Sequence, residues 1–279
     1  IKNRFAETHA EITGWRRHLH MHPELGFDVY NTAEFVEDRL REFGIVDITT
    51  GVGQTGVVAV IKGRTNARGR VIGLRADMDA LPIHEATGLE YASTVSGKMH
   101  ACGHDGHTAM LLGAAQYLAE TRNFDGTAVL IFQPAEEGGG GGLEMCRDGL
   151  MHRWGIQEIY GMHNMPGLPV GEFAIRSGAL MAAADEFSLK ITGRGGHAAA
   201  PHEAIDPNIA AAHIILALQS VASRVVDPLG NVVVSVCGLH SDTESHNVIP
   251  QVVRMRGTVR TLDSEVRDMV EVKVKELVS

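Results

Sequence analysis

The composition of this chain is that of an ordinary globular protein, and it excludes several classes of function. The 279 residues are 44% hydrophobic and 21% charged, and this length suggests two domains. The net charge of −9 argues against a nucleic-acid or anionic-membrane partner, because both need a basic face. Three widely spaced cysteines form no disulfide framework, so we expect a reducing, cytoplasmic location. We find no apolar run that approaches the roughly 20 residues of a membrane span, and no signal peptide at the polar start.

The first part of the chain alternates predicted helices and strands. The predicted helices cover residues 5–20, 30–43, 105–120 and 143–150, and the predicted strands cover 57–62, 71–76, 127–132 and a run that ends near Gly161. We expect the first two strands to be neighbours and Asp105 to cap its helix. This alternation predicts an α/β fold with a wound, mostly parallel sheet, which binds its ligands at the carboxyl ends of the strands.

The pattern changes near Gly178. The order is then strand (186–192), helix (206–224), strand (232–237), strand (252–260) and helix (263–277). This β-α-β-β-α order is that of a ferredoxin-like α+β unit without its last strand. We therefore predict one domain over residues 1–178 and a second over 179–279, and we expect a further C-terminal segment to complete both.

Metal-type donors gather at the ends of three predicted strands and at one helix start. Residues 99–108 read Met-His-Ala-Cys-Gly-His-Asp-Gly-His-Thr, a thiol and three imidazoles in ten positions. Cys102 and His104 precede a helix N-terminus, where the helix dipole favours a thiolate. Such soft and borderline donors suit a transition metal. Two alternatives are a packed cysteine beside a capping histidine, and a nucleophilic Cys102 paired with His104. The second leaves the distant carboxylates and His163 without a role.

Those distant donors follow the other predicted strands. Glu136 and Glu137 are adjacent on a loop before a run of five glycines, so one can bind a metal while the other moves a proton. The alternative is a solvated, solubilising pair. His163 ends another apolar run and is either a ligand or a packed, hydrogen-bonded histidine. Asp77 and Asp79 either include a residue that orients a ligand imidazole or simply form the turn before Pro82.

Five runs of this sequence resemble the amidohydrolase branch of the M20 metallopeptidases. They are Arg-His-Leu-His-Met-His-Pro-Glu-Leu-Gly at 17–26, Arg-Ala-Asp-Met-Asp-Ala-Leu-Pro at 75–82, His-Ala-Cys-Gly-His-Asp-Gly-His at 100–107, Gln-Pro-Ala-Glu-Glu-Gly at 133–138 and Gly-Gly-His at 195–197. The resemblance covers the whole chain. That branch includes hippurate hydrolases, aminoacylase-like enzymes and auxin-conjugate hydrolases.

The resemblance implies a site for two divalent metal ions, zinc or manganese first, with nickel or cobalt also suited. The implied metal ligands are Cys102, which bridges, and His104, Glu137 and His163. Glu136 resembles the general base and Asp79 the aspartate that supports the ligands. The family's fifth ligand, a histidine near its C-terminus, has no counterpart before Ser279.

The resemblance also implies that the second domain is a lid and dimerisation domain inserted into the catalytic one. His197 then stabilises the tetrahedral intermediate, commonly in the partner's site of a homodimer, and Asn247 contacts the substrate. The expected activity is metal-dependent hydrolysis of the amide of small N-acyl amino acids or related conjugates. The alternative is a non-catalytic metal- or ligand-binding homologue.

Overall fold

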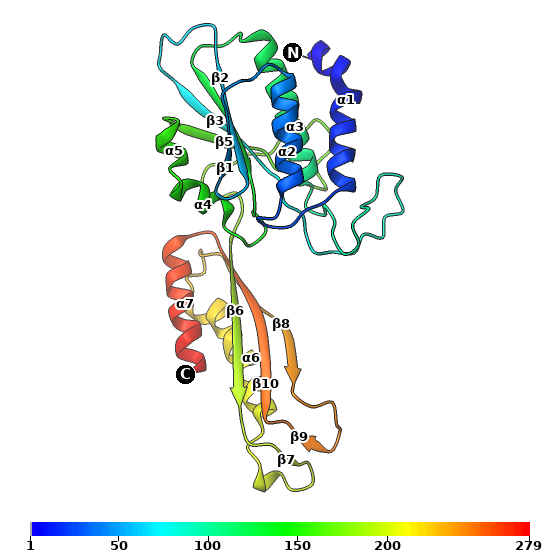
Figure 1. Ribbon diagram of the computed structural model, residues 1–279. Coiled ribbons are helices and arrows are strands. Elements are labelled where there is room, and N and C mark those ends of the chain that lie inside the picture. Colours follow the sequence, from blue (N-terminus) through cyan, green and yellow to red (C-terminus); the bar gives the residue numbers. More distant parts are fainter. Residues whose placement is uncertain (1) are drawn as a thin grey trace. The chain divides into compact units, whose positions relative to one another are not determined.

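The computed structural model describes residues 2–279 and divides the chain into two compact units, Ile1–Leu168 and Pro169–Ser279 (Figure 1). The boundary expected from the sequence, near Gly178, lies inside the second unit. Each unit has its own sheet and its own buried core.

Unit 1 is built on a five-stranded sheet with the order β1-β2-β4-β3-β5. Its strands are β1 (Ile48–Val52), β2 (Gly56–Lys62), β3 (Val71–Asp77), β4 (Thr127–Gln133) and β5 (Glu158–Gly161). Its helices are α1 (Lys2–Met21), α2 (Tyr30–Glu42), α3 (His104–Thr121), α4 (Gly141–Arg147) and α5 (Leu150–Arg153). The α/β class is confirmed. The helix expected over 143–150 is two short helices, because Gly149 adopts a left-handed φ of 84° between them.

The sheet is mixed rather than mostly parallel. β3 pairs in parallel with β4 and β5, whereas β2 pairs antiparallel with β1 and β4. β4 therefore lies between β2 and β3, and the expectation that these two strands are neighbours is wrong. The reason lies in the connections. Helix α3 carries the chain from β3 to β4 as a parallel crossover requires. The loop from β2 to β3 passes the start of β4, where the Gly63 N–H donates to Gly126 O at 2.9 Å.

Both faces of the sheet are covered, which explains the near-continuous apolar runs of its central strands. On β4, Leu130 and Phe132 pack with α1, α2 and α3, whereas Val129 and Ile131 pack on the side of α4 and α5. Figure 1 shows α1, α2 and α3 together on one side of this sheet. The carboxyl ends of β3, β4 and β5 are then one edge of the unit, and the metal-type donors follow these ends.

Unit 2 has a three-stranded antiparallel sheet with the order β6-β10-β8, covered on one face by two helices. Its elements are β6 (Ala183–Thr192), α6 (Pro207–Ser220), β8 (Val232–Ser241), β10 (Val252–Thr261) and α7 (Ser264–Val278). Alternation on β10 explains the arrangement: Val253 and Met255 are buried against the helices, while Arg254 and Arg256 are exposed. A two-residue ribbon, β7 (Gly196–His197) with β9 (Val248–Ile249), was not predicted.

Helix α6 continues as one π-type turn, and Asp206 caps its start by accepting the Asn208 N–H at 2.8 Å. Within residues 2–279, Pro207–Val225 is the one helical stretch long and apolar enough, by length and composition alone, to cross a membrane. A single such helix is weak evidence of a span, and this one includes polar side chains such as His213, Gln219 and Arg224. Ala211 and Leu218 from this stretch pack in the core of unit 2.

Candidate metal centre

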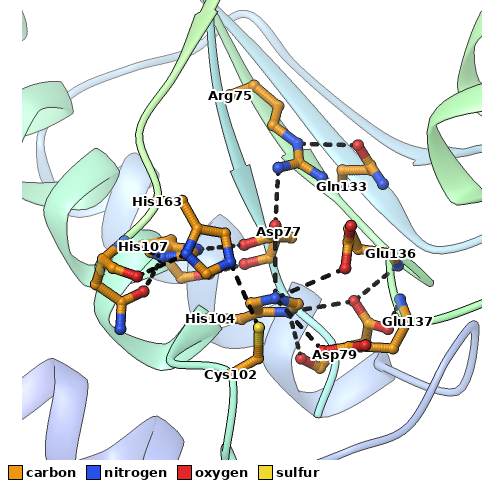
Figure 2. Close-up of polar contacts among 12 residues, drawn as sticks. Arg75, Asp77, Asp79, Cys102, His104, His107, Gln133, Glu136, Glu137 and His163 are labelled. Atoms are coloured by element: carbon orange, nitrogen blue, oxygen red, sulfur yellow. Dashed lines mark hydrogen bonds and ion pairs between the residues drawn. The ribbon is translucent and has the colours of Figure 1, made fainter. Parts of the chain in front are cut away.

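The donors predicted from the sequence meet at the strand ends of unit 1 (Figure 2). Ligand atoms of Cys102, His104 and His163 lie within 4.8 Å of one another, and so do those of His104, Glu136 and Glu137. His104 is common to both groups. Two donor groups that share a central imidazole therefore come from the start of α3 and the loop before it, from the loop after β4 and from the end of β5. A third group joins His104 to Asp77 and His107.

His104 is fully buried at the start of α3, and its ring is held from one side only. Its Nδ1 lies 2.8 Å from the backbone O of Asp79, so Nδ1 carries the proton and donates it. The lone pair is then on Nε2, which has no hydrogen-bond partner anywhere in residues 2–279. This Nε2 lies 3.8 Å from a Glu136 oxygen and 3.9 Å from a Glu137 oxygen.

His163 follows β5 and has the same kind of support, although its side chain is exposed. Its Nδ1 donates to the backbone O of Asn164 at 2.7 Å, and its Nε2 lies 3.4 Å from the Sγ of Cys102. Both histidines thus use Nδ1 on a carbonyl and leave Nε2 toward the other donors. That tautomer is the one a metal-binding imidazole needs.

The carboxylates Glu136 and Glu137 stand on a turn fixed by a third carboxylate. Asp79, fully buried, accepts the Glu136 N–H at 2.9 Å on Oδ1 and the Glu137 N–H at 3.0 Å on Oδ2. Ala135 just before them is buried with a φ of 50°, a left-handed conformation that is unusual for a residue with a Cβ. Asp79 therefore places the pair through its backbone, and this part of its role was not predicted.

The glycine run after the pair allows the turn to close tightly. Gly138 and Gly140 have φ values of 87° and 71°, which glycine adopts without strain. At Gly141, a Cβ would collide with the backbone O of Pro134, and the Gly141 N–H donates to Ala135 O at 3.0 Å. The sequence expectation of a sharp turn or close approach at these glycines is confirmed.

The electrostatics of the site differ from the sequence expectation at Cys102. Burial and the neighbouring Glu137 carboxylate, followed by Glu136 and Asp77, raise the pKa of the Cys102 thiol to about 12. The Cys102 thiol is therefore protonated at neutral pH in the metal-free chain, which differs from the thiolate expected at a helix N-terminus. Asp105, the expected N-cap, is instead in the first turn after Gly103, and its carboxylate accepts from Arg16 Nε at 2.7 Å.

The donor chemistry fits divalent transition metals. His104 Nε2 and one Glu137 oxygen are buried without a hydrogen-bond partner within residues 2–279, and unpaired buried polar atoms are costly unless something else binds them. One thiol, two imidazoles and carboxylates form a mixed soft-to-hard set that suits zinc, manganese, nickel or cobalt. The fit favours a metal over a packed cysteine with a capping histidine.

Two predicted site residues lie in unit 2, next to each other. His197 is on β7, and the Ala198 N–H that follows it donates to the backbone O of Asn247 at 3.0 Å. Both side chains are exposed, and Asn247 Oδ1 accepts the Ser245 hydroxyl at 2.7 Å. The ribbon of β7 and β9 thus joins two positions that are 50 residues apart in the sequence.

The structure also brings in residues that were not predicted as site residues, chiefly His107 and Asn164. His107 Nδ1 lies 2.6 Å from Asp77 Oδ1, and the His107 ring is 4.6 Å from the His163 ring. The sequence could have indicated His107 as a site residue, since it follows His104 by one helical turn and lies on the same face of the helix. Asn164 carried no such signal.

Comparison with known proteins identifies the family of this chain. The family model described as Peptidase family M20/M25/M40 matches residues 73–271. The chain is 46% identical to a hippurate hydrolase of Campylobacter jejuni over 269 residues, which is 96% of this chain and 69% of that protein. It is 44% identical to an N-acyl-L-amino acid amidohydrolase of Geobacillus stearothermophilus, covering 96% of this chain and 71% of that protein.

A solved structure of a related protein has a similar fold and is described as binding two metal ions. The crystal structure of a dinuclear metal-binding peptidase of this family from Bacillus subtilis matches with a TM-score of 0.78 and 40% identity, covering 98% of this chain and 70% of that one. The chain thus spans about 70% of the solved and curated proteins named here. It belongs to the amidohydrolases of peptidase family M20/M25/M40, and it is a metal-dependent hydrolase of amide bonds.

Proposed function

We propose that the substrates are N-acyl amino acids or related small conjugates, cleaved to a carboxylic acid and a free amino acid. The similarity to a hippurate hydrolase and an N-acyl-L-amino acid amidohydrolase supports this substrate class. The presence of all four implied ligands and of Glu136 favours an enzyme over a non-catalytic homologue.

The observation that carries the proposed mechanism is the position of Glu136. Its carboxylate lies beside the free Nε2 of His104 at 3.8 Å, and its backbone is fixed by Asp79. Burial, followed by the neighbouring Glu137 carboxylate, raises the Glu136 pKa, which suits a general base. Glu136 is exposed enough to meet substrate, with 43% of its side chain accessible.

In this proposal Cys102, His104, Glu137 and His163 hold the metal ions. When bound, such ions polarise an amide carbonyl and acidify water. Glu136 accepts the proton of the attacking water and later gives it to the leaving amine nitrogen. His197 donates a hydrogen bond to the oxyanion that forms from the carbonyl oxygen. Asn247, whose backbone O accepts the Ala198 N–H next to His197, contacts the substrate.

We further propose that residues 179–279 are a lid and dimerisation domain and residues 1–178 the metal-binding catalytic domain, in a cytoplasmic homodimer. Exposed apolar side chains on α6 support a partner of the same kind: Ile209 is 60% exposed and Leu216 70% exposed. Three free cysteines agree with a reducing compartment.

The test is hydrolysis of a panel of N-acetyl, N-benzoyl and N-indoleacetyl amino acids by the full-length protein, with metal content measured in parallel. Release of free amino acid from at least one series, abolished by a chelator and restored by zinc or manganese, is the expected result. Glu136→Gln is the matched control and should retain metal without turnover. Metal-loaded protein that cleaves no member of the panel would contradict the substrate class.

A further inference from the structure

A buried chain of polar groups runs beside the four proposed ligands and touches one of them: ligand atoms of Asp77, His107 and His104 lie within 4.8 Å of one another, and Asp77 Oδ2 is 3.7 Å from His104 Nε2. It begins at Asp77, the last residue of β3, which is 1% exposed. One Asp77 oxygen accepts from Arg75 Nη1 at 2.7 Å, and the other faces His107 Nδ1 at 2.6 Å. His107 is 3% exposed and lies on the first turn of α3. Both partners are therefore fixed on regular elements of unit 1.

The second nitrogen of His107 contacts Asn164 twice. The backbone N–H of Asn164 lies 3.0 Å from His107 Nε2, and the side-chain oxygen Oδ1 of Asn164 contacts the same nitrogen. His107 Nδ1 carries a proton whichever of these contacts Nε2 makes, because the Asp77 carboxylate can only accept. The side-chain nitrogen of Asn164 packs against Gly103, where any Cβ would collide with it. His107 thus links β3 to the backbone of Asn164.

His163 depends on that same backbone. Its Nδ1 donates to Asn164 O at 2.7 Å, and its ring meets the His107 ring edge-on at 68°. His163 itself is exposed, and no helix or strand covers residues 162–182. An exposed side chain on such a segment has several rotamers, and selecting one needs fixed neighbours. Two ring contacts of His163 lead back to α3, one to His104 at 6.2 Å and a closer one to His107 at 4.6 Å between ring centroids, and Asn164 is itself bonded to His107.

We infer that Asp77 and His107 are positioning residues that hold His163 in the place and tautomer in which its Nε2 faces Cys102. The inference rests on the proposed role of His163 as a metal ligand. A purely structural role, joining α3 to β3, is already served by Thr108, whose hydroxyl donates to the backbone O of Asp77 at 2.8 Å. Thr108 therefore provides a matched control on the same helix and the same partner.

The test measures Co²⁺ affinity and the Co²⁺ absorption spectrum of the full-length protein, without using hydrolysis. His107→Asn keeps an N–H for Asp77 but does not reach Asn164. We expect it to lower Co²⁺ affinity about 10- to 100-fold, as losing the partner of a ligand histidine typically does, and to alter the spectrum. Thr108→Val should lower the melting temperature and leave Co²⁺ affinity unchanged. If His107→Asn does not fold, Asp77→Asn applies the same test with nearly unchanged volume.

A double-mutant cycle with His163→Ala tests whether His107 affects Co²⁺ affinity through His163. If His107 acts through His163, His107→Asn costs little further affinity once His163 is absent. Wild-type affinity in His107→Asn, or an equal loss with and without His163, would overturn the inference. Wild-type affinity in His163→Ala would overturn the ligand assignment as well. Because no substrate is involved, failure of the proposed substrate class leaves this result intact.

Discussion

Asp79 Oδ1 accepts the backbone N–H of Glu136 at 2.9 Å, so a buried carboxylate on one strand end fixes the position of a carboxylate on another. The same residue uses its backbone O to hold His104. Asp79 thus orients an imidazole through its main chain and the glutamate turn through its side chain. The resemblance anticipated a supporting aspartate, but the separation of these two contacts is visible only in three dimensions.

Because the backbone O and the side-chain carboxylate of Asp79 make different contacts, a change of the side chain alone should affect the glutamate turn more than His104. Asp79→Asn keeps the carbonyl that binds His104, but its amide can accept only one of the two N–H groups and turns a donor toward the other. Leaving that buried N–H unpaired should cost about 1–3 kcal/mol of stability. We expect kcat to fall by about 10- to 100-fold, with a smaller change in metal affinity. Steady-state kinetics, metal titration and thermal unfolding measure the three quantities.

Ala135→Gly is the control for this variant. Glycine adopts the φ of 50° without strain, so the stability change should stay below about 1 kcal/mol and turnover should persist. A loss of metal in Asp79→Asn as large as its loss of kcat would instead mean that the side chain supports the ligands directly.

The two neighbouring glutamates should respond oppositely to the same substitution. Glu136→Gln should keep its metal while losing about 10²- to 10⁴-fold in turnover, because the amide cannot take the proton of water. Glu137→Gln should lose metal, since its buried oxygen has no hydrogen-bond partner within residues 2–279 and is proposed to be a ligand. Metal analysis after dialysis, alongside kcat, checks both variants. Metal loss in Glu136→Gln and retention in Glu137→Gln would exchange the two roles.

The pKa of Cys102 predicts its reactivity in the metal-free chain. Because burial and Glu137 raise this pKa to about 12, the thiol is protonated at neutral pH, and the reactive thiolate grows with pH. Iodoacetamide should therefore label the exposed Cys146 and Cys237 first at pH 7. Labelling of Cys102 should rise steeply at alkaline pH and stop when metal is added. Peptide mass spectrometry gives the order, and fastest labelling of Cys102 at pH 7 would favour a nucleophile.

A related substitution tests the same residue as a ligand. Cys102→Asp should retain appreciable activity, because a carboxylate can also bridge two divalent ions, whereas a nucleophilic thiol tolerates no such change. Cys102→Ser is the control, since a hydroxyl is a poorer ligand. An acyl group trapped on Cys102 by mass spectrometry would contradict the ligand role.

Sequence patterns predicted the elements better than their arrangement. Helices α1, α2 and α3 were predicted from the spacing of their apolar residues, and strands β2, β3 and β4 from short, nearly continuous apolar runs. The order of the strands is set by connections that periodicity does not record, which is why β4 was not placed between β2 and β3. The ribbon of β7 and β9 has two residues a strand, too few for a period.

The donors of the site were predictable for a similar reason. Cys102 and His104 are metal-type donors at the start of α3, and Glu137 and His163 follow strand ends, a place that α/β sheets use for ligands. Their supports were not, because the Asn164 contribution to His163 is a backbone carbonyl, and carbonyls are present at every residue. The thiolate expected at Cys102 is not present in the metal-free chain for a physical reason, since burial and three neighbouring carboxylates raise the pKa of this thiol.

The last prediction concerns the proposed sharing of each site between two subunits. His197 and the metal donors belong to different units of the chain, and an oxyanion donor must lie about 3 Å from the reacting oxygen. His197→Ala and Glu136→Gln should each be nearly inactive alone. Co-refolded in equal amounts, they should form heterodimers in which one of two sites has both residues intact, which restores roughly one quarter of wild-type activity.

The matched control is a mixture of Glu136→Gln with Glu137→Gln. These residues are adjacent, so a site draws both from one chain, and every site in the heterodimer keeps one defect. This mixture should stay inactive, whereas the mixture with His197→Ala recovers. Subunit exchange is verified by mass spectrometry of differently tagged chains, because an inactive mixture counts only if heterodimers have formed. If they have formed and the His197→Ala mixture remains inactive, His197 acts within its own chain. If His197→Ala is fully active by itself, His197 has no part in the reaction.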